Sequence, residues 1–174
     1  MYQREKCMPT TLARITAVTI CLCFALLNDS SRAYGEEFVP KAEKGAYGLS
    51  LNYPGGGIKY YMSDYFVLEA KGQVEGNVKV GGLRVYNHFF TSDRLYLFWG
   101  LEADYIDYKG TASRGAGGAG EFFCGFEYFI LPTVSLQADL GPAYIYLKDR
   151  RDPVTVSGIE YVTNFAFTLY FGGH

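Results

Sequence analysis

The chain has 174 residues, of which 49% are hydrophobic and 17% aromatic, and its formal net charge is −2. This length fits one domain, and the composition excludes a disordered chain. A slightly acidic balance excludes the basic footprint of a nucleic-acid-binding protein, so no nucleic-acid partner is expected.

Residues 1–35 have the layout of a signal peptide, in which basic residues precede an apolar run over 15–27. That run is shorter than the roughly 20 residues of a membrane-spanning helix. Small residues place the cleavage after Gly35. The mature chain would then keep only Cys124 of the four cysteines, so no intrachain disulfide is expected, and 12 basic against 16 acidic residues, a net charge near −4.

A short polar lead-in is expected over 36–44, and from Gly45 onward the hydrophobic pattern has a period of two, which is typical of strands. Turns rich in Gly, Pro, Ser and Asp separate the apolar runs. The predicted strands cover residues 46–53, 58–62, 66–74, 78–90, 95–108, 122–131, 136–147 and 159–171. This arrangement defines a barrel domain over 45–171, followed by a tail over 172–174.

Two positions interrupt the regular pattern. The alternation slips by one residue within 78–90, which predicts a β-bulge at Gly81-Gly82. Pro142 lacks a backbone donor inside a predicted strand, which predicts a second bulge at Gly141-Pro142.

The linkers between the predicted strands alternate in length. Short turns lie at 63–64, 92–93 and 132–133, and the two longest loops, 109–120 and 149–157, fall at the opposite end. Short turns at one rim and longer loops at the other are typical of outer-membrane barrels. The sequence therefore predicts an all-β, eight-stranded antiparallel up-and-down transmembrane β-barrel, in which the first strand pairs with the last because lipid tolerates no open edge.

A secreted soluble eight-stranded barrel that binds an apolar ligand is the main alternative, since it has the same period-two pattern. The polar register favours the membrane barrel, because it is rich in small residues that suit a narrow interior. Aromatic residues near both ends of the apolar register also favour it, because they would form two girdles. The girdle positions are Tyr53, Tyr105, Phe122, Tyr144 and Tyr161 at one rim, and Phe66, Phe89, Tyr128 and Phe171 at the other.

Eight strands leave a lumen just wide enough for side chains to fill it. The polar register therefore predicts an ion network inside the barrel, not an open pore. Its predicted members are Lys59, Glu69, Lys71, Arg84, Glu102, Asp104, Glu127, Asp139 and Glu160. If Val74 lies opposite Val78 and the Gly81-Gly82 bulge adds one residue, Glu69 lies opposite Arg84, which predicts a buried ion pair. The same count across Pro132 places Glu127 opposite Asp139.

Evidence for catalysis is weak. His88 and Ser92 are the residue types that a lipid-modifying barrel enzyme uses, but the sequence places no acidic partner beside them. We interpret them as a rim histidine and a turn serine, and we expect no catalytic residue, cofactor or metal. A lipid-modifying outer-membrane enzyme is the second alternative.

The chain resembles the small outer-membrane β-barrel domain family that includes opacity-type proteins. The likeness covers about 45–171 and rests on the start Tyr47-Gly48-Leu49-Ser50-Leu51-Asn52-Tyr53, the hairpin Lys59-Tyr60-Tyr61-Met62-Ser63-Asp64 and the aromatic final strand. In that strand Phe165, Phe167, Leu169 and Phe171 look like the C-terminal signal read by the outer-membrane assembly machinery. The resemblance implies a porin-like protein in the lipid of a Gram-negative outer membrane. We expect a structural or surface-interaction role through loops 109–120 and 149–157.

Overall fold

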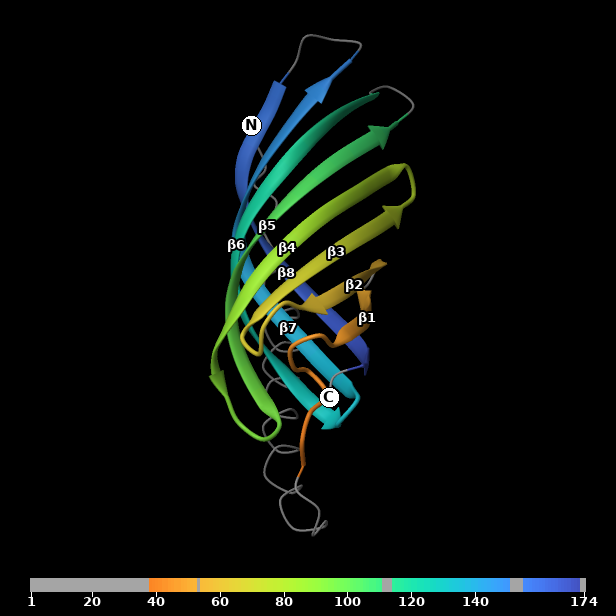
Figure 1. Cartoon of the computed structure of the whole chain (residues 1–174). Helices are drawn as coiled ribbons and strands as arrows, with labels where there is room; N and C mark the ends of the chain where they lie inside the picture. The colour runs from red at the N-terminus through yellow and green to blue at the C-terminus, as the bar shows by residue number, and fades with distance from the viewer. Residues whose placement is uncertain (1–37, 53, 111–113, 151–154, 173–174) are drawn as a thin grey trace, which may run out of the picture. The chain divides into compact units, whose positions relative to one another are not determined.

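The computed structural model describes residues 38–52, 54–110, 114–150 and 155–172. The predicted signal peptide and part of the tail lie outside these residues. The described chain forms eight antiparallel strands that follow one another around a closed barrel (Figure 1). They are β1 (Tyr47–Asn52), β2 (Gly55–Tyr61), β3 (Phe66–Glu75), β4 (Val78–Thr91), β5 (Leu95–Lys109), β6 (Arg114–Leu131), β7 (Val134–Asp149) and β8 (Thr155–Phe171).

The predicted closure of the barrel is confirmed. β1 pairs with β8 from Tyr47 opposite Phe171 to Asn52 opposite Ala166. The described residues include no helix long and apolar enough to cross a membrane.

The period-two pattern separates an interior face from an exterior face. In β3, Val67 and Glu69 are buried, whereas the alternating Phe66 and Leu68 are exposed on the outside. The same alternation continues through β5, where Glu102 is buried and Leu101 is exposed. The fold thus turns its charged register inward and its apolar register outward.

Four strands begin earlier than the sequence predicted. β2 starts at Gly55, β6 at Arg114, β7 at Val134 and β8 at Thr155. Most of the predicted loop 109–120 is therefore strand, as are Asp149 and residues 155–157 of the predicted loop 149–157. The glycine-rich stretches were predicted as turns because glycine is rare inside strands. Backbone hydrogen bonds to long neighbouring strands keep these glycine-rich stretches in the sheet in spite of the low strand propensity of glycine.

The predicted bulge at Gly81-Gly82 is wrong. β3 and β4 keep one register from Glu75 opposite Val78 to Phe66 opposite Asn87. The turn consists of residues 76–77 only, and Gly76 has φ +56° there. Glu75 therefore already pairs with Val78, and the register that places Glu69 opposite Arg84 needs no extra residue. A register shift occurs instead between His88 and Phe90, against β5.

The predicted bulge at Gly141-Pro142 is also wrong, because β7 keeps its register on both sides of this point. A Cβ atom on Gly141 would collide with the backbone of Phe122, so β6 and β7 approach closely there. The proline is instead accommodated on the outer face, where the ladder to β6 skips Phe122 and Phe123.

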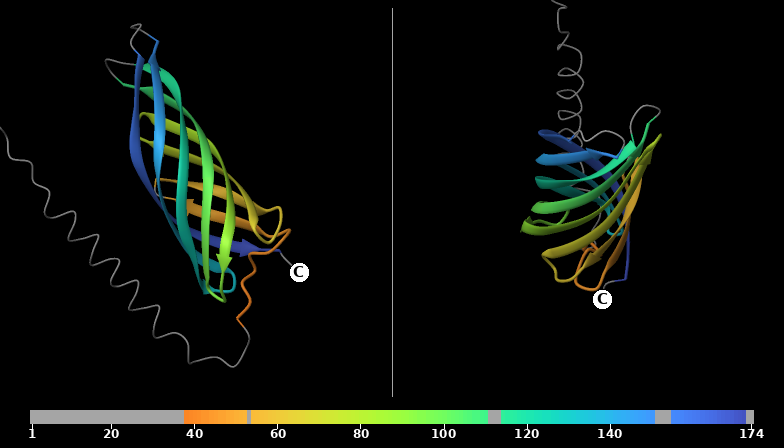
Figure 2. Two further views of the ribbon diagram at one scale, coloured as in Figure 1. Left: turned by 90° about the vertical axis from the view of Figure 1, so that its left-hand side faces the viewer. Right: turned by 90° about the horizontal axis from the view of Figure 1, so that it is seen from above.

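The length of the strands differs around the barrel. β1 and β2 have six and seven residues, whereas β7 and β8 have 16 and 17. β7 and β8 therefore continue well beyond the ends of β1 and β2 (Figures 1 and 2).

The described part of the lead-in packs against the rim that carries the short turns. The amide of Lys41 donates to the carbonyl of Pro132 at 2.7 Å, and the guanidinium of Arg94 lies 4.1 Å from the ring centroid of Phe38. Ala42 is buried against the same rim. The lead-in therefore stays at the end opposite the one where β7 ends at Asp149 and β8 begins at Thr155.

Close packing inside the barrel predicts an asymmetric response to two glycine substitutions. A Cβ on the inward Gly100 would lie 2.5 Å from Phe123 Cζ, whereas the nearest atom to a Cβ on the outward Gly120 is 4.0 Å away. We expect Gly100→Val to lower the free energy of unfolding by about 1–3 kcal/mol through overpacking. Gly120→Val is the matched control and should leave the urea midpoint of the purified barrel nearly unchanged; equal effects of the two would contradict the inward placement of Gly100.

Candidate functional site: the charged barrel interior

A single row of inward residues crosses all eight strands. Each member lies opposite the next in the strand register, so the row follows the tilt of the barrel. The row runs Gly48, Lys59, Glu69, Arg84, Glu102, Glu121, Ala143 and Glu160. Its charges alternate in sign from Lys59 to Glu102, and then only acids follow.

Arg84 is the centre of the first cluster, which we call the Arg84 cluster. Its Nε lies 2.8 Å from Glu102 Oε2, its Nη2 donates to Asp139 Oδ1 at 2.8 Å, and its Nη1 is 3.9 Å from Glu69 Oε2. The guanidinium also lies 4.0 Å from the ring centroid of Phe123. The predicted Glu69-Arg84 pair is therefore present, but Arg84 contacts Glu102 and Asp139 more closely.

Other polar groups complete this cluster. Ser50 Oγ donates to Glu69 Oε1 at 2.6 Å, and Asn164 Nδ2 donates to Asp139 Oδ1 at 2.9 Å. Lys71 forms an ion pair with Glu102. Buried charges are tolerated when such partners replace the lost water.

A second cluster surrounds the fully buried Glu127, closer to the short turns. Its Oε1 accepts hydrogen bonds from Ser135 Oγ and Tyr170 Oη, both at 2.5 Å, and lies 3.5 Å from Lys59 Nζ. Lys59 also donates to the side-chain oxygen of Gln137. This Glu127 cluster ties strands β2, β6, β7 and β8 together.

Aromatic rings fill the space beside the two clusters. His88 stacks on Tyr61 with centroids 5.7 Å apart and meets the Phe98 ring edge-on. The inward rings are Tyr61, Tyr86, His88, Tyr96, Phe98, Phe123, Phe129 and Tyr170. Several of their side chains are completely buried.

The interior carries more acid than base. Three cations, Lys59, Lys71 and Arg84, face six inward carboxylates, namely Glu69, Glu102, Asp104, Glu121, Glu127 and Asp139. Glu121 is 5% exposed, and among the described residues its buried Oε1 has no hydrogen-bond partner. Asp104 Oδ1 is also buried without a hydrogen-bond partner among the described residues. The unbalanced acids lie on β5 and β6.

The structure brings seven of the nine predicted network residues into the two clusters, and two lie outside them. Asp104 is half-buried beside Gly82, and Glu160 is exposed. Glu160 keeps its inward register, but none of the described strands covers it on the side away from β7, because β1 ends at Asn52. Its predicted place in a buried network is therefore wrong.

The predicted opposition of Glu127 and Asp139 is wrong as well. Glu127 lies opposite Gln137, and Asp139 lies opposite Gly125. The turn at Pro132 contains a register shift between Phe129 and Leu131, which residue counting did not include. The two acids therefore belong to different clusters, each with its own cation.

His88 is not a rim histidine. Its side chain is 2% exposed, and Nε2 lies 3.8 Å from Glu127 Oε2, whereas Ser92 is exposed in the β4–β5 turn. Across the described ranges, no three residues among His, Cys, Asp and Glu are grouped so as to hold a metal ion.

Sequence reasoning missed Glu121 and the polar partners Ser135, Gln137 and Tyr170. Glu121 precedes the outward Phe122, so the alternation alone places it inside. It was overlooked because 109–120 was interpreted as a loop that ended beside it.

No protein-family profile and no curated protein sequence matches this chain. Among solved structures, the chain is similar to the N-terminal β-barrel domain of Pseudomonas aeruginosa OprF, with a TM-score of 0.55 and 14% sequence identity. The match covers 74% of this chain and 98% of that domain. At this identity the likeness establishes the fold, an eight-stranded β-barrel.

The geometry of the Arg84 cluster predicts that exchanging two charges will not restore stability. Arg84→Met should lower the free energy of unfolding by about 3–5 kcal/mol, because it leaves buried carboxylates without their cation. Exchanging the pair, as Glu69→Arg with Arg84→Glu, would place the new acid against Glu102 and Asp139. We expect the double variant to be at least as unstable as Arg84→Met in urea titrations.

The control for this experiment is Lys109→Met, which removes a half-exposed lysine near Asp107. It should change stability by less than about 0.5 kcal/mol. If the double exchange restored the stability of the unchanged protein, the ion pair with Glu69 would be the main stabilising contact of Arg84, which would contradict the prediction.

Proposed function

We propose that this protein is an integral barrel of the bacterial outer membrane with a packed polar interior and a structural role. The observation that carries the proposal is the inversion of polarity across the wall. Large apolar side chains point outward, whereas charged side chains such as Glu69 and Arg84 are completely or almost completely buried inside. Lipid solvates the first surface, and the pairing of β1 with β8 closes the ring of strands along residues 166–171.

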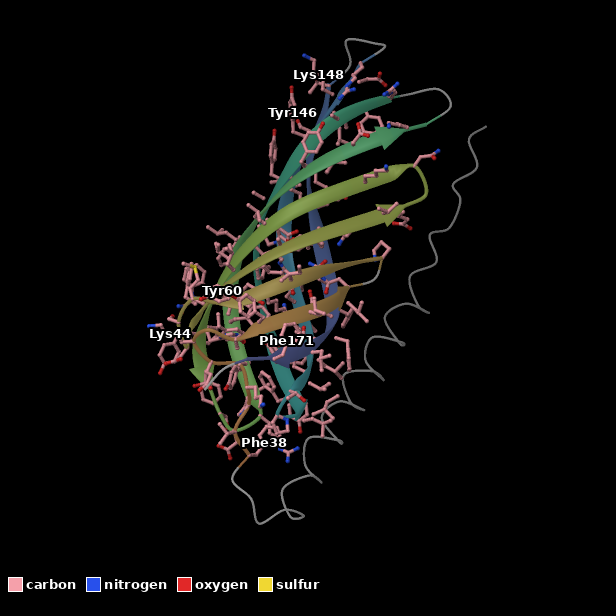
Figure 3. All side chains as sticks on the ribbon, turned by 45° about the vertical axis from the view of Figure 1, so that its right-hand side comes forward. Phe38, Lys44, Tyr60, Tyr146, Lys148 and Phe171 are labelled. Carbon is pink, nitrogen blue, oxygen red and sulfur yellow. The ribbon has the colours of Figure 1, made fainter. Side chains whose placement is uncertain are left out.

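The outward surface has a banded arrangement that suits a bilayer. Its middle carries aliphatic and aromatic residues, including Leu101 and Leu140, which are about half exposed. Tyr146 lies toward the end where β7 finishes, near Lys148, and Phe171 lies toward the other end (Figure 3). An apolar surface of this extent would drive aggregation in water.

A soluble barrel that carries an apolar ligand is less well supported. Such a protein needs an apolar interior, but the interior here is occupied by the Arg84 and Glu127 clusters and by closely packed rings. Because these side chains fill the lumen, the interior is better described as a packed polar core than as a water-filled channel.

We infer that the protein is not an enzyme. His88 lies inside among aromatic rings, and its ring nitrogens have no hydrogen-bond partner among the described residues. Ser92 is turned to the outside at the rim. A nucleophile and its base must lie within hydrogen-bond reach, and this separation does not supply that arrangement.

The opacity-type relationship and insertion by the assembly machinery stay predictions from the sequence motifs. The exposed positions of Phe165 and Phe167 suit an assembly signal that is read from the outer face of β8. Because the loops are short, the tall walls of β5 to β8 offer more surface to a partner than the loops do.

A charged substitution on the outer face distinguishes lipid from water around the barrel. Leu101→Arg should destabilise a barrel folded in lipid by about 2–4 kcal/mol near the bilayer midplane. In a soluble barrel the same exposed position would tolerate arginine within about 0.5 kcal/mol. Ile159→Arg, outside the apolar band, is the control and should be nearly neutral in reversible unfolding from lipid vesicles.

Membrane location can also be tested directly. The protein should fractionate with outer membranes and, when extracted without heating, should migrate differently on a gel from the boiled sample, because a folded barrel resists the detergent. Recovery in the soluble periplasmic or secreted fraction would contradict the proposal.

A further inference from the structure

The part of β8 farthest from the short turns has a backbone edge that no described strand covers. β7 pairs with β8 up to Lys148 opposite Thr155, but β1 pairs with it only up to Asn52 opposite Ala166. We call the side of residues 155–165 that faces away from β7 the free edge. It spans eleven residues.

The shear of the barrel explains why this edge is open. The row of inward residues starts at Gly48 of β1, which lies opposite Tyr170 of β8. After crossing the other strands it reaches β8 at Glu160, ten residues before Tyr170 in the chain. To cover Glu160, β1 would have to continue six residues past Asn52. Instead β1 ends at Asn52, which pairs with Gly55 at the start of β2.

The amides on the free edge can be identified from the register. The N–H of Tyr170 points to the β7 side, where it donates to Thr133. Because successive residues of a strand point their N–H groups to opposite sides, those of Tyr161, Thr163 and Phe165 point to the free edge.

Leaving these groups unpaired is costly if the proposed membrane location is correct. A tilted strand crosses the bilayer in about nine to eleven residues, and residues 161–171 satisfy that length. The lower half of the free edge would then lie in hydrocarbon, where each unpaired group costs several kcal/mol. This step rests on the proposed function, but the existence of the free edge does not.

The free edge also lacks the features by which proteins block strand addition. It contains one charged residue, Glu160, and no proline, and most of its side chains are exposed. The lead-in cannot cover it, because Lys41 is bonded to Pro132 at the opposite rim.

The charges near the free edge indicate the chemistry of what would cover it. The row alternates from Lys59 to Glu102 and then ends in two acids, Glu121 and Glu160, without a cation. A basic residue opposite Glu160 would restore the alternation. On the outer face, Phe165, Tyr161 and Ile159 would favour apolar neighbours.

We propose that the free edge of β8 is an interaction surface that accepts an extended segment of a partner protein as an added antiparallel strand. The segment alternates apolar residues with polar ones and carries a lysine or arginine opposite Glu160. It enters above the β1–β2 turn and continues the seam between β1 and β8. This mode of recognition is β-augmentation.

A second copy of this chain fits the surface less well. Two copies inserted in one membrane have β8 running in the same sense, so their free edges cannot meet as a regular antiparallel pair. A partner segment has no such restriction.

The test uses the full-length protein in detergent and a fluorescent peptide of about ten residues, in which valine alternates with threonine and a lysine stands at the centre. Thr163→Pro removes one donor from the free edge and leaves the β7 ladder intact, and Thr163→Val is the matched control that keeps it. We expect the peptide to bind the unchanged protein and the valine variant equally. It should bind the proline variant at least about tenfold more weakly.

Charge recognition is tested with a peptide whose central lysine is replaced by glutamate. Glu160→Lys should reverse the preference between the two peptides. Gel mobility before and after boiling verifies that each variant is folded, and it reports on the membrane proposal independently of peptide binding.

Three outcomes would overturn the inference. The first is that neither peptide binds the folded protein, and the second is that the proline variant binds as tightly as the valine variant. The third is efficient disulfide dimerisation in membranes of Thr163→Cys in a Cys124→Ser background, since the edge would then be occupied by a second copy.

Discussion

The structure depends on pairing the backbone hydrogen bonds of its strands around a ring. Pairing of β1 with β8 closes the ring, and closure forces one register of every strand into a narrow lumen. Because that lumen is small, its charges must be paired with one another. The Arg84 and Glu127 clusters are therefore consequences of closure as much as of residue choice.

Closure is complete only at the end that carries the short turns. There β1 and β2 complete the ring, and the lead-in packs against the rim. Toward the other end β1 stops and β8 continues, so the same requirement for paired backbone groups is left unmet along 155–165. Glu121 and Glu160 lie in the row that ends at this opening, which connects the electrostatics of the interior to the proposed partner surface.

The two wrongly predicted bulges, at Gly81-Gly82 and at Gly141-Pro142, show where the local sequence pattern does not determine the strand register. β4 keeps one alternation past Gly81, with Val78 and Val80 on the same side as Arg84, so the pattern needed no bulge. The proline at 142 needed no extra residue because Gly141 allows β6 to approach. Glycine-rich segments of β2 and β6 became strand because neighbouring strands offered hydrogen-bond partners. Such cross-strand effects are not visible in a single run of sequence.

The sequence by itself determined the number of strands, the inward and outward registers and most of the buried charges, because each follows from period-two alternation within one strand. It also predicted Glu69 opposite Arg84, although the count included a bulge at Gly81-Gly82 that the structure lacks. Only the tertiary structure decided that Arg84 contacts Asp139, that His88 is buried and that Glu160 is exposed. Those facts depend on strands distant in sequence and on how high each one extends, which no local pattern encodes.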